Sequence, residues 1–405
     1  VAFNQFGSFD LRSNGFKTGI RTEKYGFLLT YNYHHAQGYR PNNEDYWHIV
    51  NTVLETSPGD LSHLYVYGYF VDGLIRLPGS LTKAQFDADP FQPNAKDVGR
   101  DTRRITAKGR VAVRFHTFLE EEQTNEIDLT LYGTSKYFER TASNYRIIGR
   151  DGFGATARFV TRAELFGRPN EFTMGTDLFY QSGPVETYQN IGGKKGDRLD
   201  KLIDETIGNT GFYIQNTFNL IRGKLDLLLS GRYDKVLFDS RNLLAEVQND
   251  ARRFEDFTPK AALNFKLTPT IAAFTSYGLS FDSPAANELD NPKTTSSSTA
   301  SLLNPDLKPQ QSKNFELGVK GNVVTPEEGL PHSLFFEATF FNTIIDDEIV
   351  PFELAPGDVF FRNSARTRRT GLELGANIEI VKGLKLKASY TFSDFKYKEY
   401  ITRTI

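Results

Sequence analysis

The strand-like segments of this chain are joined by connections that alternate between short turns and long polar loops. The short turns are predicted at Thr22–Lys24, Ser57–Asp60, Gly167–Asn170, Arg222–Lys224, Thr268–Thr270 and Lys382–Gly383. The long loops are predicted near residues 37–45, 77–99, 141–151, 184–205, 239–251, 283–310 and 347–359. Short turns on one side of a sheet and long loops on the other are typical of an antiparallel β-barrel that spans a membrane, with turns in the periplasm and loops outside the cell.

The strands show the period of two residues that a sheet with unlike faces requires. From Leu384 to Ser393, leucine, alanine, tyrosine and phenylalanine alternate with lysine, serine and threonine. We predict strands at 5–20, 25–37, 45–56, 61–76, 100–119, 124–140, 152–166, 170–183, 206–221, 224–238, 252–267, 270–282, 311–324, 332–346, 360–380 and 383–398. The predicted fold class is therefore all-β, a transmembrane antiparallel β-barrel of which about sixteen strands are present.

A soluble β-sandwich would explain any single strand equally well, because one face would meet another sheet and the other would meet water. The short–long alternation along the whole chain favours the membrane barrel. So do the tyrosine and phenylalanine residues at many strand ends, since membrane interfaces carry aromatic girdles. Barrels of about 16–18 strands enclose an aqueous channel, whereas those of about 22 strands have a plugged lumen. The number of strands leaves both types open.

Composition excludes several other classes of protein. The 405 residues carry a formal net charge of −2 and have an isoelectric point near 6.4, so nucleic acid is not a predicted partner. The chain has no cysteine, which rules out a disulfide framework and a thiolate nucleophile. Only 39% of the residues are hydrophobic, the mean hydropathy is −0.43, and no long uninterrupted apolar run occurs. No transmembrane helix is therefore predicted.

The chain is predicted not to be an enzyme, because its sequence shows no recognisable set of catalytic groups. None of its six histidines lies in an HExxH pattern, and no nucleophile–base pair, pair of acids or phosphate-binding loop stands out. Neighbouring strand residues face opposite sides, so His34 is predicted to face the interior and His35 to lie at the outer rim. We predict no catalytic residue, no cofactor and no directly bound metal.

Basic and aromatic residues gather near the predicted outer ends of the strands. Guanidinium groups bind carboxylates through paired hydrogen bonds and aromatic rings supply apolar contact area, so this mixture suits an anionic ligand. The same residues could instead bridge anionic lipopolysaccharide or pair with nearby acids such as Asp97 and Asp101. The candidate ligand-binding residues are His34, Tyr39, Arg40, Trp47, Arg76, Arg100, Arg103, Arg104, Arg146, Tyr188, Arg366 and Arg368.

Three stretches in the second half of the chain carry motifs of a known family. Ser276–Pro284 followed by Asn304–Gly321 resembles the "SYS.SF..P" strand end and the "NP.LKPE.S.N.E.G.K" loop-to-strand segment of TonB-dependent outer-membrane receptors. Gln310 stands where the family usually has Glu. Arg362–Leu374 is similar to the family's "N...(S/R).G.E.E" strand, and Ala388–Asp394 to its "SYTY.DA" strand. In this order and spacing, the three stretches together resemble a TonB-dependent receptor barrel.

This resemblance implies active transport across the bacterial outer membrane. Receptors of this family bind ferric siderophores or other ferric chelates and are energised by the TonB–ExbB–ExbD complex through a plug domain, without covalent chemistry. Arg76–Gln92 looks like a loop of ferric citrate receptors, which implies a ferric-citrate-like anionic chelate. Residues 1–405 are then expected to be part of a barrel of roughly 22 strands, with the plug and the last strands outside this chain.

Other functions stay open. The chain could belong to a passive porin-like channel, or to a TonB-dependent receptor for another small ligand, such as cobalamin or an anionic cofactor. Its long loops could also bind host or phage proteins. Outer-membrane lipid and lipopolysaccharide are expected partners in each case, because a barrel wall meets lipid along its apolar face.

Overall fold

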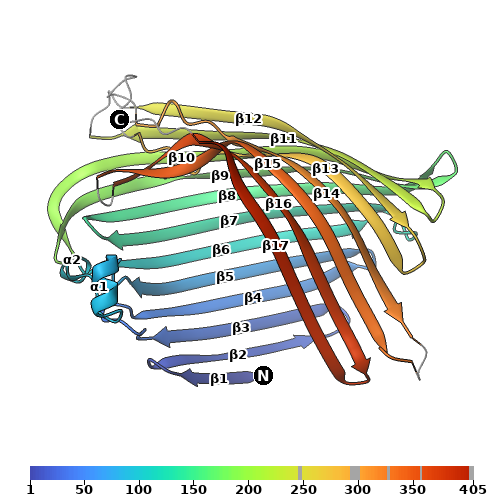
Figure 1. Ribbon diagram of the computed structural model, residues 1–405, viewed down its shortest axis with the longest axis horizontal. Helices are drawn as coiled ribbons and strands as arrows, with labels where there is room; N and C mark the ends of the chain where they lie inside the picture. The colour runs from blue at the N-terminus through green and yellow to red at the C-terminus, as the bar shows by residue number, and fades with distance from the viewer. Residues whose placement is uncertain (245–248, 292–301, 326–328, 356–357, 401–405) are drawn as a thin grey trace. The chain divides into compact units, whose positions relative to one another are not determined.

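The computed structural model describes residues 1–244, 249–291, 302–325, 329–355 and 358–400. Within these ranges, 17 strands form one sheet in which strands adjacent in sequence pair with each other (Figure 1). The strands are β1 (Ala2–Gly7), β2 (Leu11–Arg21), β3 (Tyr25–Ala36), β4 (Asp45–Gly59), β5 (Ser62–Arg76), β6 (Arg103–Phe118), β7 (Asn125–Thr141), β8 (Asn144–Leu165), β9 (Arg168–Ile191), β10 (Lys194–Ile221), β11 (Leu225–Asn242), β12 (Asp250–Lys266), β13 (Ile271–Asp282), β14 (Gln310–Val324), β15 (Ser333–Ala355), β16 (Asp358–Val381) and β17 (Leu384–Tyr400). The all-β prediction is confirmed.

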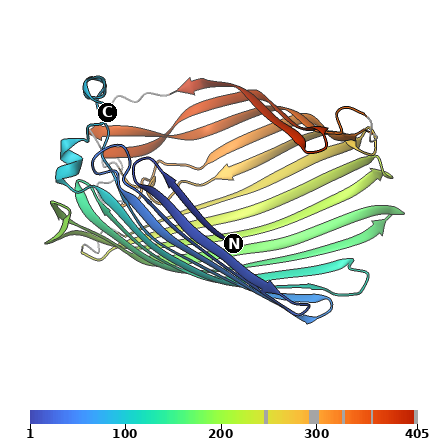
Figure 2. The same ribbon diagram turned by 90° about the horizontal axis from the view of Figure 1, so that it is seen from below.

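The chain divides into two compact units. The first unit comprises Val1–Arg158, Asp177–Asn209 and Leu237–Ala251, and the second comprises Phe159–Thr176, Thr210–Val236 and Arg252–Ile405. In the first unit, strands β2 to β6 lie side by side, and the short helices α1 (Lys83–Ala88) and α2 (Ala95–Gly99) lie beyond their ends (Figure 1). In the second unit, strands β13 to β17 lie side by side (Figure 2).

Strand β6 shows how the sheet acquires two unlike faces. Its pairing with β5 and β7 runs without a register shift from Arg103 to Thr117, so alternate residues stay on one face. One face carries Val111 and Val113, which are 59% and 40% exposed. The other face carries Lys108 and Arg114. In a membrane barrel the apolar face meets lipid, and the charged face lines the lumen.

Aromatic side chains collect on the apolar face of β3 and β4. The Tyr31 hydroxyl lies 2.8 Å from Nδ1 of His48, and the ring centroids of Tyr33 and His48 are 4.8 Å apart. Tyr33 and His48 lie directly opposite each other in the register of the two strands. This clustering agrees with the predicted aromatic residues near strand ends, where amphipathic rings are stable at a membrane–water interface.

The first predicted strand, 5–20, is wrong because the chain turns within it. Phe9 and Asp10 have φ angles of 60° and 55°, which reverse the chain between β1 and β2. The Asp10 carboxylate accepts a hydrogen bond of 2.9 Å from Nε of Arg12 and so supports the turn. Ser8 and Asp10 are common turn residues, but Phe6 and Phe9 beside them favour strands, so the sequence pattern reads as continuous.

Three predicted long loops are also wrong, because the strands continue through them. Strands β7 and β8 are joined by the two residues 142–143 rather than by a loop at 141–151. Strands β9 and β10 are joined by Gly192 and Gly193, whose φ angles are 58° and 86°, and most of 184–205 is strand. Most described residues of 347–359 are strand as well. Above a membrane both faces of a hairpin meet water, so extended strands there are polar and read as loops.

The other predicted connections agree better with the structure. Loops 37–45 and 77–99 are confirmed, although α1 and α2 inside the second were not predicted. The turns at 22–24, 222–224, 268–270 and 382–383 are confirmed, and those at 57–60 and 167–170 are displaced by up to a few residues. Parts of the predicted loops 239–251 and 283–310 lie outside the described residues. No helix in the described ranges has the length and apolar character needed to cross a membrane.

Candidate functional site

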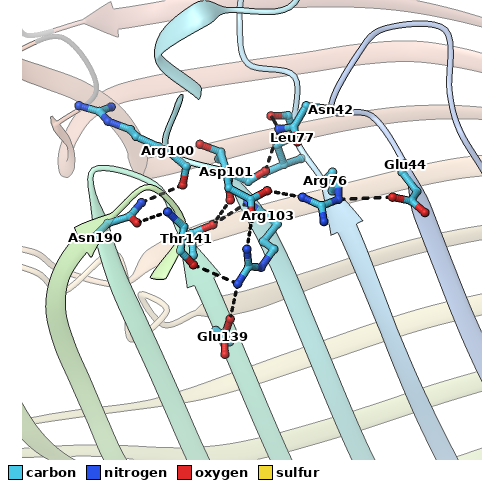
Figure 3. Close-up of polar contacts among 12 residues, drawn as sticks. Asn42, Glu44, Arg76, Leu77, Arg100, Asp101, Arg103, Glu139, Thr141 and Asn190 are labelled. Atoms are coloured by element: carbon cyan, nitrogen blue, oxygen red, sulfur yellow. Dashed lines mark hydrogen bonds and ion pairs between the residues drawn. The ribbon is translucent and has the colours of Figure 1, made fainter. Parts of the chain in front are cut away.

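An ion-pair network centred on Asp101 holds the loop between β5 and β6 at the outer ends of the strands (Figure 3). Arg76, at the end of β5, and Arg103, at the start of β6, both donate to the Asp101 carboxylate. Arg103 also donates to Glu139 on β7, with an Nη2–Oε1 distance of 3.3 Å. Burial lowers the pKa of Arg103, but Asp101 and Glu139 outweigh burial and raise its pKa above the ordinary value. This guanidinium is therefore a fixed positive charge that fastens three elements together.

The tip of the β9–β10 hairpin is fastened to the same loop (Figure 3). The Asn190 side-chain amide donates to the Arg100 carbonyl at 3.0 Å and to the Ala142 carbonyl at 2.8 Å. Arg103 donates to the Gly193 carbonyl at 3.1 Å. Side-chain donors thus link one loop to the tips of two hairpins. Their acceptors are backbone carbonyl groups at turns, which have no partner in the strand ladders.

Polar side chains of the β3–β4 connection tie it to the β5–β6 loop. Arg40 donates from Nε to the Gln92 carbonyl and from Nη2 to the Gly79 carbonyl, at 2.9 Å in each case. Asn42 donates to the Leu77 carbonyl at 2.9 Å. Irregular backbone must find such partners outside a ladder, because unpaired carbonyl groups are costly when buried. Arg40 is therefore engaged in holding the loop structure.

The aromatic candidates form two clusters near these loops. The rings of His34 and Trp47 are stacked, with centroids 4.6 Å apart and planes inclined by 12°. The ring of Tyr39 meets Phe9 and Phe91 edge-on, with centroid distances of 6.4 and 6.1 Å. Because Tyr39 is 53% exposed, it offers both ring area and a hydroxyl group to a ligand at the rim.

The arginines predicted to act together lie on opposite faces of the sheet. Arg76 and Arg103 are directly opposite each other on the face of β6 that also carries the valines. Arg104 is on the charged face, where it lies opposite Arg140 of β7. Arg100 and Arg104 are exposed, whereas Arg76 and Arg103 are partly buried and ion-paired. The sequence alone does not show which face each arginine occupies, because this depends on the register of the strands.

Arg146 and Tyr188 lie on β8 and β9 of the first unit. The Tyr188 hydroxyl donates to Glu186 at 2.6 Å, and the ammonium group of Lys195 lies 4.4 Å from the Tyr188 ring centroid. A cation over an aromatic face is attracted by the ring's negative face. Arg146 is partly buried. The structure thus couples Tyr188 to both an acid and a base.

Arg366 and Arg368 belong to the second unit, on β16. Arg366 Nε lies 2.9 Å from Oδ1 of Asp346, and Arg368 Nε donates to the Asn342 side-chain oxygen at 2.8 Å. Both side chains therefore contact the neighbouring strand β15 within the second unit.

The motif at residues 304–308 has a structural role that the sequence does not reveal. Asn304 and Leu307 are only 4% and 1% exposed. Arg252 donates to the carbonyl groups of both residues, and the Asn363 amide donates to the Lys308 carbonyl at 2.9 Å. The end of the long β13–β14 loop is thereby packed against β12 and β16.

A charged cluster on β6, β7 and β8 was also missed by the sequence analysis. Arg114 Nε donates to both carboxylate oxygens of Asp128, at 3.0 and 2.9 Å. The possible ligand atoms of His116, Glu126 and Asp128 lie within 4.8 Å of one another. Arg114 and Arg158 pair with these two carboxylates, so their charge is already balanced, and we infer no metal ion there.

Comparison with known proteins identifies the family. The family model "TonB dependent receptor-like, beta-barrel" matches residues 3–404. The chain therefore belongs to the TonB-dependent receptor-like β-barrel family. It is 25% identical over 218 residues to the ferrioxamine B receptor of Salmonella typhimurium strain SL1344, which covers 53% of this chain and 28% of that receptor.

Solved structures of low sequence identity share the fold. The unliganded ferric citrate transporter FecA has a TM-score of 0.77 at 14% identity, covering 98% of this chain and 59% of that protein. The siderophore receptor PiuA of Acinetobacter baumannii has a TM-score of 0.75 at 15% identity, covering 98% and 63%. The alcaligin receptor FauA of Bordetella pertussis has a TM-score of 0.70 at 16% identity, covering 98% and 60%. The chain spans less than two thirds of the length of each.

Replacing Asp101 by Asn should loosen the β5–β6 loop. The change removes the charge that holds two arginines, which should cost about 1–2 kcal/mol because the groups are only partly buried. We expect faster proteolysis between β5 and β6 in the folded full-length protein, with a lower melting temperature. Asp87→Asn on the exposed helix α1 is the matched control. Equal proteolysis of the two variants would show that the network does not hold the loop.

Proposed function

We propose that this chain forms the barrel wall of an outer-membrane receptor for TonB-dependent uptake of a ferric chelate. The observation that carries the proposal is the family match over residues 3–404, which is nearly the whole chain. Two similar proteins are named for iron complexes, a ferrioxamine B receptor and a ferric citrate transporter.

The proposal includes parts of the receptor that lie outside this chain and the complex that energises transport. The chain covers 28% of the ferrioxamine B receptor and 59% of the ferric citrate transporter. A plug domain and the last barrel strands are proposed to lie outside it, and the TonB–ExbB–ExbD complex is proposed to act through that plug. The wall itself performs no covalent chemistry. Its apolar face meets outer-membrane lipid, and its charged face lines the path of the ligand.

The ligand is proposed to be a ferric siderophore or a ferric-citrate-like anionic chelate. Arg100 and Arg104 offer exposed guanidinium groups at the outer ends of the strands, and Tyr39 offers an exposed ring. Guanidinium groups recognise carboxylates through paired hydrogen bonds. Arg76 and Arg103 are proposed to shape the rim, because their charges are paired with Asp101 and its neighbours.

The uptake of labelled iron by iron-starved cells tests the proposed function. Cells with the complete gene product and with TonB should accumulate iron from at least one chelate in a panel of citrate, hydroxamate and catecholate complexes. Matched cells without TonB should not, because the energy for transport would be absent. An absence of TonB-dependent uptake for every chelate would contradict the proposal.

A passive channel is the second candidate, since a charged face also suits a water-filled pore. The conductance of the complete protein in a planar bilayer separates the two candidates. A plugged receptor should be nearly silent, whereas an open pore conducts steadily. Uptake that is the same with and without TonB would also favour the pore.

Two neighbouring arginine substitutions should have different effects. Arg104→Ala should weaken binding of an anionic ferric chelate by about tenfold, or about 1.4 kcal/mol, and should not lower the melting temperature. Arg103→Ala should lower the melting temperature, because Asp101 and Glu139 lose a common partner. Calorimetric titration and thermal unfolding of the full-length receptor measure these effects. Unchanged affinity in Arg104→Ala would remove this residue from the ligand site.

A further inference from the structure

Strands β6 and β7 carry like charges directly opposite each other on the charged face. Lys108 lies opposite Lys136, and four residues further toward the outer end Arg104 lies opposite Arg140. The pairing contains no register shift between these positions, so all four side chains project from the same face. Like charges opposite each other in a sheet are destabilising. At the level of Lys108 and Lys136, the chain therefore accepts an unfavourable interaction.

The strand on the other side of β6 does not relieve this repulsion. It places Val71 opposite Lys108 and Ile75 opposite Arg104. On the β8 side, the positive charge of Arg150 acts on Lys136 together with that of Lys108. Arg150 is itself paired, with Glu205 of β10. The local excess of positive charge is concentrated around the two lysines.

Elsewhere in the same unit, basic side chains on these strands are matched with acids. Arg114 on the same face of β6 forms a two-pronged interaction with Asp128. Arg103 on the opposite face pairs with Asp101 and Glu139. The sheet thus offers carboxylates at nearby positions. By contrast, Lys108 lies opposite Lys136, so the negative charge that would balance these two lysines must come from outside these strands.

We propose that the charged face of β6 and β7 between Arg104 and Lys136 is a subsite for a multiply charged anion. Such a ligand would convert the repulsion between Lys108 and Lys136 into attraction toward a common partner. Arg110 borders the subsite, with its guanidinium carbon 5.5 Å from the Tyr132 ring centroid. This inference rests on the proposed uptake function, in which an anionic ferric chelate would meet the charged face. It adds the place and the charge class of the ligand.

The test uses the purified full-length receptor and two iron complexes that differ in net charge. Iron(III) tris-catecholate is a trianion, and iron(III) tris-acetohydroxamate is neutral. The double variant Lys108→Gln/Lys136→Gln should bind the trianion about tenfold to hundredfold more weakly than the unmodified receptor, since charge-assisted hydrogen bonds are lost. Its affinity for the neutral complex should not change. Calorimetric titration at low salt measures both affinities.

Thermal unfolding without ligand gives a second, independent readout. The double variant should melt at a higher temperature than the unmodified receptor, because a repulsive pair has been removed. If the lysines had a purely structural role, the double variant would melt at a lower temperature than the unmodified receptor. The matched control is Lys385→Gln/Lys387→Gln on β17, where Lys385 lies opposite Glu379 rather than opposite a lysine. This control should neither raise the melting temperature nor weaken binding of the trianion.

Three results would overturn the subsite. The double variant could bind the trianion as tightly as the unmodified receptor. Its melting temperature without ligand could fall, which would mean that an acid elsewhere in the whole protein already balances the lysines. The unmodified receptor could also show no preference for the trianion over the neutral complex. Failure of the uptake proposal is distinct, because it would appear as a lack of TonB-dependent iron uptake in cells even where trianion binding depends on the lysines.

Discussion

The unshifted pairing of neighbouring strands is the constraint on which the rest of the structure depends. Because β5, β6 and β7 stay in register along their paired lengths, every second residue returns to the same face. Along the middle of these strands one face is apolar, and the other collects lysine, arginine and histidine. A shift of one residue would exchange the two faces completely. The same register decides that Arg103 and Arg104, which are adjacent in sequence, serve different purposes.

Charged side chains on this sheet occur in two kinds of arrangement. At the outer ends of the strands, Asp101 gathers two arginines and holds the β5–β6 loop in place. On the charged face, Lys108 and Lys136 are left opposite each other. The first arrangement stabilises a rim, and the second keeps positive charge available to a partner at some expense in stability. Stability and binding are often opposed at functional sites in this way.

Much of the fold could be predicted from the sequence, because strand alternation and short turns are local properties. Features that depend on distant partners could not. The turn at Phe9 and Asp10 depends on positive φ angles that the sequence pattern does not show, and the polar hairpin that ends at Gly192 reads as a loop although it is paired strand. For the candidate site, the clustering of basic residues was visible. The pairing of Arg103 with Glu139 was not, because the two residues lie 36 positions apart and meet only when the strands between them fold.

The assignment of the two faces can be tested most directly by fluorophores at adjacent positions of β7. The 405 residues contain no cysteine, so Leu131→Cys and Thr130→Cys can be labelled singly in a full-length receptor from which any cysteine outside these residues has been removed, in lipid vesicles. Leu131 is 65% exposed on the apolar face, and Thr130 is on the charged face opposite Arg114. We expect brominated acyl chains to quench the label at position 131 and not the label at 130. Equal quenching at both positions, or quenching only at 130, would contradict a wall with one lipid-facing side.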